Sequence, residues 1–200
     1  MNYSFKGFFY QTFIDPLLKG NQDSVCKHIG SADRVIDIAC GTGSLSLAIA
    51  RNAAWVTGID LSEEIISTAK RTAARRNVKN VTFEYRDASD LSCYSDGEFE
   101  VAVSSMAIHQ FNSDLAIKIL TEMKRISSKI IIADYAFPMK SGFSRRLAFG
   151  IERLAGGEHH RNFKVYMRNG GLPFFLKESG LRLKAFTNRG NGVFVIAICD

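Results

Sequence analysis

Long apolar runs are absent from this sequence of 200 residues. No stretch approaches the roughly 20 consecutive apolar residues that a membrane-spanning helix requires, so we expect no transmembrane segment. The first residues, MNYSFKGFFYQTF, are rich in aromatic side chains but lack a basic stretch followed by an apolar run, so we expect no secretory signal. These two absences favour a cytoplasmic protein.

Cysteine pairs at metal-binding or redox spacing are absent too. The four cysteines are scattered without a Cys-x-x-Cys motif, which indicates reduced structural thiols: Cys26, Cys40, Cys93 and Cys199. Glu158-His159-His160 suggests metal ligands at first sight, but adjacent histidines do not by themselves face one point. No Cys or Asp partners are spaced around them. We therefore expect no metal, and we interpret His159 and His160 as polar loop residues that face a substrate cleft.

The basic residues form no dense cluster outside one predicted helix. The net charge is +6, and the only dense run, residues 70–76, lies on an amphipathic helical pattern. A dispersed basic surface favours contact with solvent, so we expect no nucleic-acid partner. Hydrophobic residues make up 46% of the chain and charged residues 23%, which is typical of one folded domain over residues 1–200.

Short apolar runs alternate with helical patterns from about residue 33. Strands are predicted at residues 34–38, 55–59, 81–85, 99–103 and 129–133. Helices are predicted at 45–50, after a cap at Ser62, and around Ala116–Met123 after a cap at Asn112 or Ser113. This alternation predicts a doubly wound α/β fold with a mostly parallel sheet. We interpret Trp55 and most phenylalanines as core residues.

The end of the chain departs from this alternation. Residues 181–186 and 193–198 form two strand-like runs around the turn-forming sequence Thr-Asn-Arg-Gly-Asn-Gly. They predict an antiparallel hairpin at the end of the sheet. Residues 1–30 and 137–178 lie outside the core pattern, and we expect them to form lid or acceptor segments.

The strongest motif runs from Val35 to Ser46, where a strand leads into Gly41-Thr-Gly43 and then a helix. Glycines at such a turn allow a ligand to approach the backbone closely. Asp60 ends the second strand, 17 positions after Gly43, and Asp87 follows the third strand. Because parallel strands end at one edge of the sheet, these residues predict a ligand crevice at that edge.

Four ordered segments resemble the motifs of class I methyltransferases that depend on S-adenosylmethionine (SAM): Asp37-x-Ala-Cys-Gly41-Thr-Gly43, Gly58-Ile-Asp60-Leu-Ser62, Arg86-Asp87-Ala88 and Phe99–His109. The resemblance covers residues 33 to about 135 and is similar to the small-molecule, quinone-biosynthesis (type 11) branch. It implies a Rossmann-like methyltransferase fold, SAM as cofactor and S-adenosylhomocysteine (SAH) as product. Ala39 stands where many members have glycine, and Glu100 stands where aspartate is common.

The resemblance also implies roles for individual positions. The loop from Ala39 through Cys40 and Gly41 to Gly43 would approach the methionine part of SAM. Asp37 either belongs to the same ligand shell or satisfies backbone amides at the turn. Asp60 would bind the ribose hydroxyls, and Leu61 would pack on the adenine. Asp87 and Ala88 would meet the adenine amino edge, while Ser104 or Ser105 would line the methionine side.

Residues on the acceptor side are less defined by the sequence. His109 follows the fourth strand, where it either contacts or deprotonates the acceptor or is a polar loop residue. Tyr10, with its aromatic neighbours, is either a lid over SAM or a packing residue. Aromatic and basic residues gather in the segment 137–178: Phe143, Arg145, Arg146, Phe149, Arg153, His159, His160, Arg161 and Tyr166. They predict a small or lipid-like acceptor with an apolar body and an acidic or oxygen-rich end, unless they only pack the segment onto the sheet.

The predicted activity is direct in-line transfer of the methyl group to such an acceptor. Three alternatives stay open. A SAM-binding protein without catalysis could act as a regulator, and an NAD(P)-binding oxidoreductase would use the same fold but would favour glycine at Ser46. An RNA methyltransferase is favoured by the basic charge alone, and Ser104–Ala107 shows no Asn-Pro-Pro-Tyr-like tetrad.

Overall fold

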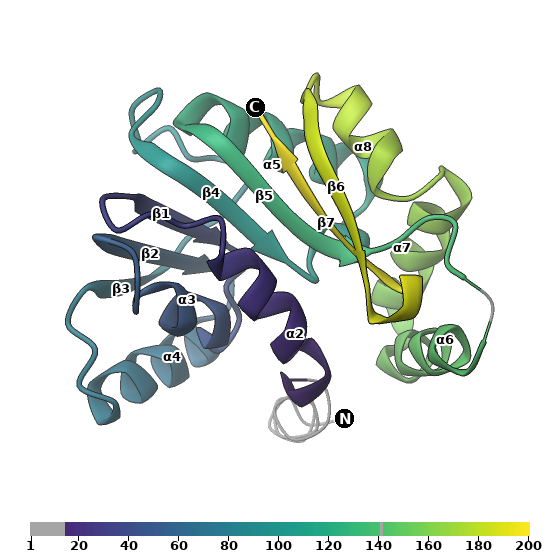
Figure 1. The fold of residues 1–200 in the computed structure, drawn as a ribbon, viewed down its shortest axis with the longest axis horizontal. Coiled ribbons are helices and arrows are strands. Elements are labelled where there is room, and N and C mark those ends of the chain that lie inside the picture. The colour runs from purple at the N-terminus through teal and green to yellow at the C-terminus, as the bar shows by residue number, and fades with distance from the viewer. Residues whose placement is uncertain (1–14, 141) are drawn as a thin grey trace.

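The computed structural model describes residues 15–140 and 142–200, with side chains from Gly20 onward. Seven strands form one sheet in the order β3-β2-β1-β4-β5-β7-β6 (Figure 1). Five of them pair in parallel: β1 (Arg34–Ile38), β2 (Trp55–Asp60), β3 (Val81–Tyr85), β4 (Phe99–Ser105) and β5 (Ser127–Tyr135). The last two are antiparallel: β6 (Leu183–Arg189) and β7 (Phe194–Cys199). This mixed sheet confirms the predicted fold class.

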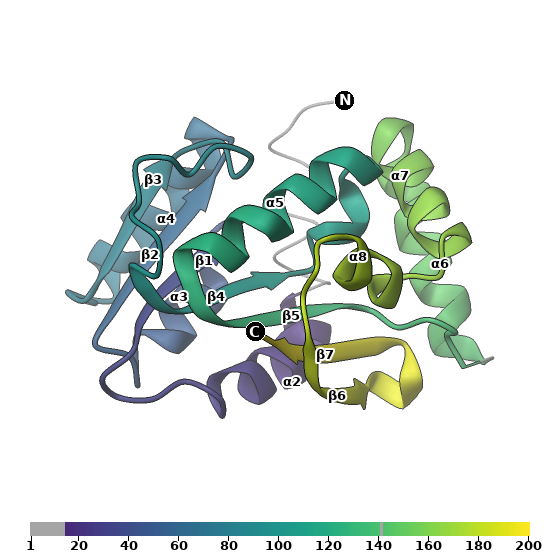
Figure 2. The ribbon, with the colours of Figure 1, turned by 90° about the horizontal axis from the view of Figure 1, so that it is seen from above.

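Helices cover both faces of the sheet. Figure 2 shows α2 (Asp15–Cys26) on one side and α5 (Ser113–Ile126) with α8 (Leu172–Glu178) on the other. The side of α2 also holds α3 (Ser44–Ile49), which packs on alternate strand residues such as Val35 and Val56. It holds α4 (Glu63–Arg75) as well, which packs on Phe83 of β3. The intervening strand residues, Ile36 and Ile38 among them, face α5 and α8. The period of two along each strand therefore divides the core into two layers.

Side-chain caps start two of these helices. Ser62 accepts a hydrogen bond from the Ile65 backbone N–H at 3.4 Å, as predicted for the start of α4. Asn112 accepts one from the Leu115 N–H at 2.9 Å, so Asn112 rather than Ser113 caps α5. Each bond satisfies an amide that the first helical turn leaves without a partner.

Residues 137–178 hold three helices. They are α6 (Phe143–Ala155), α7 (Gly157–Arg168) and the core helix α8. The interpretation of His159 and His160 as loop residues is therefore wrong, since both lie on α7. Figure 1 shows α6 and α7 beside the carboxyl end of β5, and α7 packs against η2 (Ile108–Gln110), the short helix that follows β4.

Two further expectations need correction. The turn of the terminal hairpin is shorter than predicted, because Thr187, Asn188 and Arg189 continue β6 and pair with β7, leaving only η3 (Gly190–Gly192) as the turn. Trp55 is 41% exposed and is not a core residue. It is the first residue of β2, where the following four residues are buried but the strand end is not covered.

Two expectations remain, the lid formed by the N-terminal segment and the absence of a membrane-spanning helix. Residues 1–14 of the N-terminal segment, Tyr10 among them, lie outside the described residues, and the expected role of the segment as a lid stays a prediction. Among the residues described, no helix has both the length and the apolar character needed to cross a bilayer.

Candidate functional site

The loop after β1 owes its shape to left-handed backbone conformations. Ala39, Gly41 and Gly43 have φ angles of 57°, 55° and 79°. A Cβ atom on Gly43 would lie 2.6 Å from the Phe83 ring, so only glycine fits there. A Cβ atom on Gly41 would meet no atom of the described chain within 4 Å, which leaves the backbone of Gly41 open to a ligand.

Asp60 ties this loop to the end of β2. Its Oδ2 accepts a hydrogen bond from the Gly41 N–H at 3.0 Å, and its Oδ1 accepts one from the Ser62 N–H at 3.1 Å. Burial raises the pKa of Asp60, and the backbone hydrogen bonds of Gly41 and Ser62 oppose that rise. The adjacent Leu61 is 61% exposed, an unusual position for a large apolar side chain.

Asp37, Cys40 and Ser104 lie beneath the loop rather than on its surface. The Ser46 hydroxyl donates a 2.6 Å hydrogen bond to Oδ2 of Asp37. Burial raises the Asp37 pKa to about 7, although the Ser46 bond opposes the rise. Ser104 is buried and donates to the Ile38 carbonyl at 3.2 Å, and burial raises the pKa of the Cys40 thiol. These three side chains support the loop from inside.

The chain after β3 reaches the same edge. The Arg86 N–H donates to the Asp60 carbonyl at 3.0 Å, which brings the next residues beside the end of β2. Asp87 is exposed and accepts a hydrogen bond from the Ser89 N–H at 2.8 Å, while Ala88 is half-buried. The structure thus brings the predicted residues of four strand ends to one edge of the sheet.

His109 lies in η2 at the centre of a buried polar cluster. Its side chain is 1% exposed, and its Nδ1 lies 2.6 Å from Oδ1 of Asp134, a fully buried residue of β5. Its Nε2 points toward Glu152 on α6, at 3.5 Å from Oε1. The Tyr135 hydroxyl donates to the same Oε1 at 2.8 Å.

The two predicted acceptor-side histidines differ in their surroundings. Nε2 of His159 lies 2.6 Å from Oε2 of Glu152, and the rings of His159 and His109 are 5.6 Å apart. His160 is half-buried, and its Nδ1 has no hydrogen-bond partner in the part of the chain that the structure describes. The structure thus brings His109 and His159 together around one carboxylate, without His160.

Electrostatics favour positive charge in this cluster. Burial lowers the pKa of His109, but Asp134 and Glu152 outweigh it and raise the value to about 9. Burial would raise the pKa of Glu152, yet its contacts with His109 and His159 hold it well below its usual range. The cluster therefore favours a protonated His109 that faces an ionised Glu152.

Asp134 and Glu152 were not predicted as site residues. Asp134 interrupts the apolar run Ile130–Tyr135 of a buried strand, and Glu152 lies on the same helix face as the buried Ala148. A charge inside an otherwise apolar face is the signal that could have identified both.

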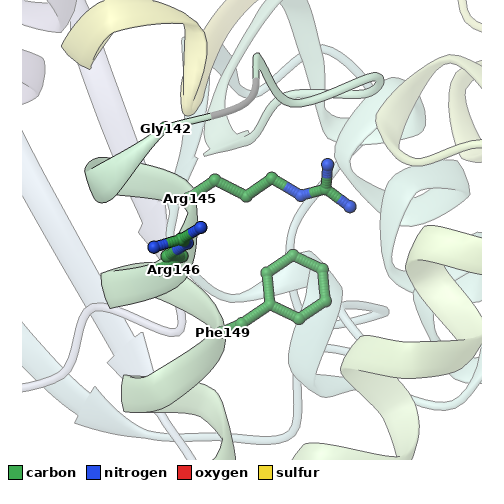
Figure 3. Close-up of a pocket in the computed structure, with 4 residues that line it drawn as sticks. All are labelled: Gly142, Arg145, Arg146 and Phe149. Carbon is green, nitrogen blue, oxygen red and sulfur yellow. The ribbon is translucent and has the colours of Figure 1, made fainter.

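A surface hollow of about 370 Å³ lies along α6, lined by Gly142, Arg145, Arg146 and Phe149. Figure 3 shows the Arg145 side chain extended above the Phe149 ring, with the guanidinium carbon 5.5 Å from the ring centre. Phe149 also contacts Phe163, which in turn lies 6.0 Å from the His109 ring. Phe163 and Tyr166 are fully buried, which favours a packing role for both.

Comparisons with known proteins agree with this geometry. A family model described as a methyltransferase domain matches residues 29–164, more than half of the chain. The ubiquinone biosynthesis O-methyltransferase of Xanthomonas euvesicatoria is 27% identical over 157 residues, covering 76% of this chain and 63% of that protein. The chain thus spans less than two thirds of the length of this curated relative.

Solved structures share the fold. The PH0226 protein of Pyrococcus horikoshii superposes with a TM-score of 0.73 at 19% identity, covering 96% of this chain and 97% of that one. A SAM-dependent methyltransferase of Aquifex aeolicus gives 0.63 at 16% identity, with 89% and 88% covered. The Rossmann-like fold inferred from the motifs is thus confirmed. On the match to the family model, this chain belongs to the SAM-dependent methyltransferases.

Proposed function

We propose that this protein transfers a methyl group from SAM to a small-molecule acceptor. The observation that carries the proposal is the edge of the sheet where the open backbone of Gly41, the Asp60 carboxylate and the exposed Leu61 lie together. Family membership supports the cofactor. The name of the Xanthomonas relative supports a small acceptor, because that protein is an O-methyltransferase of ubiquinone biosynthesis.

The residues present fit SAM. Gly41 leaves space next to the backbone, which suits the close approach of a ligand. The Asp60 carboxylate accepts two amide hydrogen bonds and has lone pairs left for the ribose hydroxyls. Leu61 and Ala88 would bound the adenine, with Asp87 at its polar edge. Asp37, Cys40 and Ser104 would act from beneath, by holding the loop of Ala39 and Gly43 in shape.

When bound, SAM supplies a methyl group on a positively charged sulfur. The chain's own part is to hold both reactants in line, to exclude water and to accept a proton where the acceptor loses one. His109 lies just beyond β4, on the acceptor side of the predicted cofactor edge. We assign it to the acceptor, with His159 and His160 on the neighbouring α7.

The acceptor proposed here has an apolar or aromatic body and an acidic or oxygen-rich end, on a small or lipid-like molecule. Support comes from the hollow along α6, where a guanidinium and an aromatic ring lie together. Aromatic rings supply apolar contact area, and arginine binds carboxylate or phenolate oxygens. The contacts from Phe149 through Phe163 to His109 link this hollow to the buried cluster.

Two measurements test the proposal. Calorimetry should detect binding of SAM and SAH but not of NAD, and radiolabelled SAM should methylate members of a panel of aromatic acids, phenols and quinols. His109→Gln should lower turnover on the identified acceptor while leaving SAM affinity nearly intact. SAM binding without transfer to any acceptor would favour the regulatory alternative, and NAD binding in place of SAM would overturn the proposal.

A further inference from the structure

Three ligand-type atoms from distant parts of the chain converge beside η2. They are Nε2 of His109, a carboxylate oxygen of Glu152 and an imidazole nitrogen of His159, and all lie within 4.8 Å of one another. The residues come from η2, α6 and α7. The sequence predicted no metal, because the local spacing around His159 shows no ligand set. Its two partners are His109, which is distant in sequence, and Glu152, which lies on another helix.

The His109 ring is held in the orientation of a metal ligand. Its Nδ1 lies 2.6 Å from Oδ1 of Asp134, and the backbone N–H groups of His109 and Tyr135 donate to the same carboxylate at 3.3 and 2.7 Å. Because Asp134 accepts the Nδ1 proton, the His109 ring can bind a cation through Nε2 once Nε2 has released its own proton. This carboxylate–histidine arrangement is the usual support behind a metal-bound imidazole.

The facing atoms lack hydrogen bonds in the part of the chain that the structure describes. His109 Nε2, Glu152 Oε2 and His159 Nε2 are all buried without a hydrogen-bond partner. Glu152 Oε2 and His159 Nε2 lie 2.6 Å apart, which makes them an ion pair when His159 is protonated. The 3.5 Å separation of His109 Nε2 from Glu152 Oε1 is too long for a charge-assisted hydrogen bond. One cation placed among these atoms would replace the contacts of Glu152 with the two imidazoles and would be bound by all three side chains.

We propose that His109, Glu152 and His159 form a binding site for a divalent transition-metal ion, with Zn²⁺ as the favoured cation. Two imidazoles and one carboxylate match the ligand set of open zinc sites, which keep a fourth position for water or a ligand. Asp134 orients His109, and the Tyr135 hydroxyl holds Glu152 at Oε1, leaving Oε2 for the cation. The inference goes beyond methyl transfer and does not depend on the identity of the acceptor.

Charge and access fit a cation. The carboxyl groups of Asp134 and Glu152 are both buried, while His159 is 26% exposed and opens the cluster on the side of α7. A hard cation such as Mg²⁺ would favour oxygen ligands, whereas two nitrogen ligands favour zinc and its neighbours in the first transition row. The metal would enter past His159.

The experiment uses the untagged full-length protein, stripped with EDTA and titrated with Zn²⁺ against a chelating indicator. The ligand variants are Glu152→Gln and His159→Gln. The matched control is His160→Gln, which alters the adjacent histidine on the same helix. Asp134→Asn tests the supporting residue. Circular dichroism of every variant checks folding, and Co²⁺ spectra distinguish nitrogen and oxygen ligation from binding to the four thiols.

One equivalent of Zn²⁺ should bind to the wild type and to His160→Gln, and should raise their unfolding temperatures. Binding should weaken at least ~10-fold in folded Glu152→Gln and His159→Gln, and by about 10–100-fold in Asp134→Asn. Absence of binding to the wild type, unchanged affinity in both ligand variants, or a Co²⁺–thiolate band would overturn the site. SAH calorimetry on the same samples separates this result from the proposed function, because SAH can bind whether or not zinc does.

Discussion

Ser46 donates a hydrogen bond of 2.6 Å from its Oγ to Oδ2 of Asp37, which joins the first helix after the glycine loop to the end of β1. Ser46 stands where the dinucleotide-binding pattern favours glycine. The hydrogen-bond partner of the buried Asp37 carboxylate therefore lies at the position where this chain departs from the dinucleotide-binding pattern. This pair has consequences for stability that can be measured.

The first prediction concerns pH. The pKa of Asp37 is raised to about 7 by burial, so between its unfolded value near 3.8 and about 7 the folded protein holds a proton that the unfolded chain releases. The contribution of Asp37 to stability is therefore present at low pH and is lost as pH rises to about 7. Relative to the wild type, Asp37→Asn should gain stability with rising pH, by a few kcal/mol at most on this ~3-unit shift.

Urea denaturation at a series of pH values from 4.5 to 8 tests this. Ser46→Ala is the companion variant, because it removes a bond that favours the ionised form and should extend the loss of stability to higher pH than in the wild type. A stability difference between Asp37→Asn and the wild type that does not change with pH would contradict the assigned shift.

The second prediction separates two glycines of one loop. Gly43→Ala combines a φ of 79° with a contact of 2.6 Å to the Phe83 ring, so it should lower stability by several kcal/mol or prevent folding. Gly41→Ala has free space and should cost only about 1–2 kcal/mol for its left-handed backbone. Thermal unfolding gives the order, and equal losses in both variants would show that the Phe83 contact is unimportant.

The third prediction concerns the cofactor edge. Asp60→Ala should weaken SAM binding by roughly 1.5–3 kcal/mol, the scale of hydrogen bonds to a charged group. Asp87→Ala should weaken it less, because that carboxylate is exposed. Asp90→Ala is the control, since it also accepts an amide bond two residues ahead, from Ser92, but is not among the predicted site residues. Unchanged affinity in a folded Asp60→Ala protein would refute the ribose assignment.

Much of the fold could be predicted from local patterns. The bounds of β1 and β3 match the prediction because each is a short run of strand-forming residues between polar turns. The Ser62 cap was also predictable from local sequence, because the capping side chain and the amide that it accepts from lie only three residues apart. The prediction of Trp55 as a core residue was wrong because it relied on the general preference of large apolar side chains for the core. The exposure of one residue depends on where the neighbouring elements end.

The acceptor side could not be predicted in this way. His109 and Asp134 are 25 residues apart in sequence, and Glu152 joins them only because α7 packs against η2 and α6 packs against α7. Ligand spacing in sequence is informative where one helix or turn holds all the ligands, as in a zinc finger. Here three separate elements supply the atoms, so only the tertiary structure brings them together.

The fourth prediction tests whether the buried aromatics of α7 act in packing. The Tyr166 hydroxyl donates to the Tyr135 carbonyl at 2.8 Å, and its ring stacks on Phe175. Tyr166→Phe should keep the stacking and lose one buried hydrogen bond, which costs about 1 kcal/mol of unfolding free energy. SAM affinity and the KM for the acceptor should be unchanged. A raised KM at unchanged stability would show that Tyr166 contacts the acceptor.

The last prediction concerns the hollow on α6. The Arg145 side chain extends over the Phe149 ring, so its guanidinium lies beside an aromatic surface and can bind an anionic end of the acceptor (Figure 3). Arg145→Ala should raise the KM of an acidic acceptor about fivefold, the scale of an exposed charge pair of ~1 kcal/mol, with little change in kcat. Arg153→Ala is the matched control, because it removes the same charge from an exposed position of the same helix outside the hollow.

Steady-state kinetics at two salt concentrations should show the Arg145 effect shrinking at high salt, since screening weakens the pair in the wild type. Equal effects of both substitutions would mean that net charge, and not this hollow, attracts the acceptor.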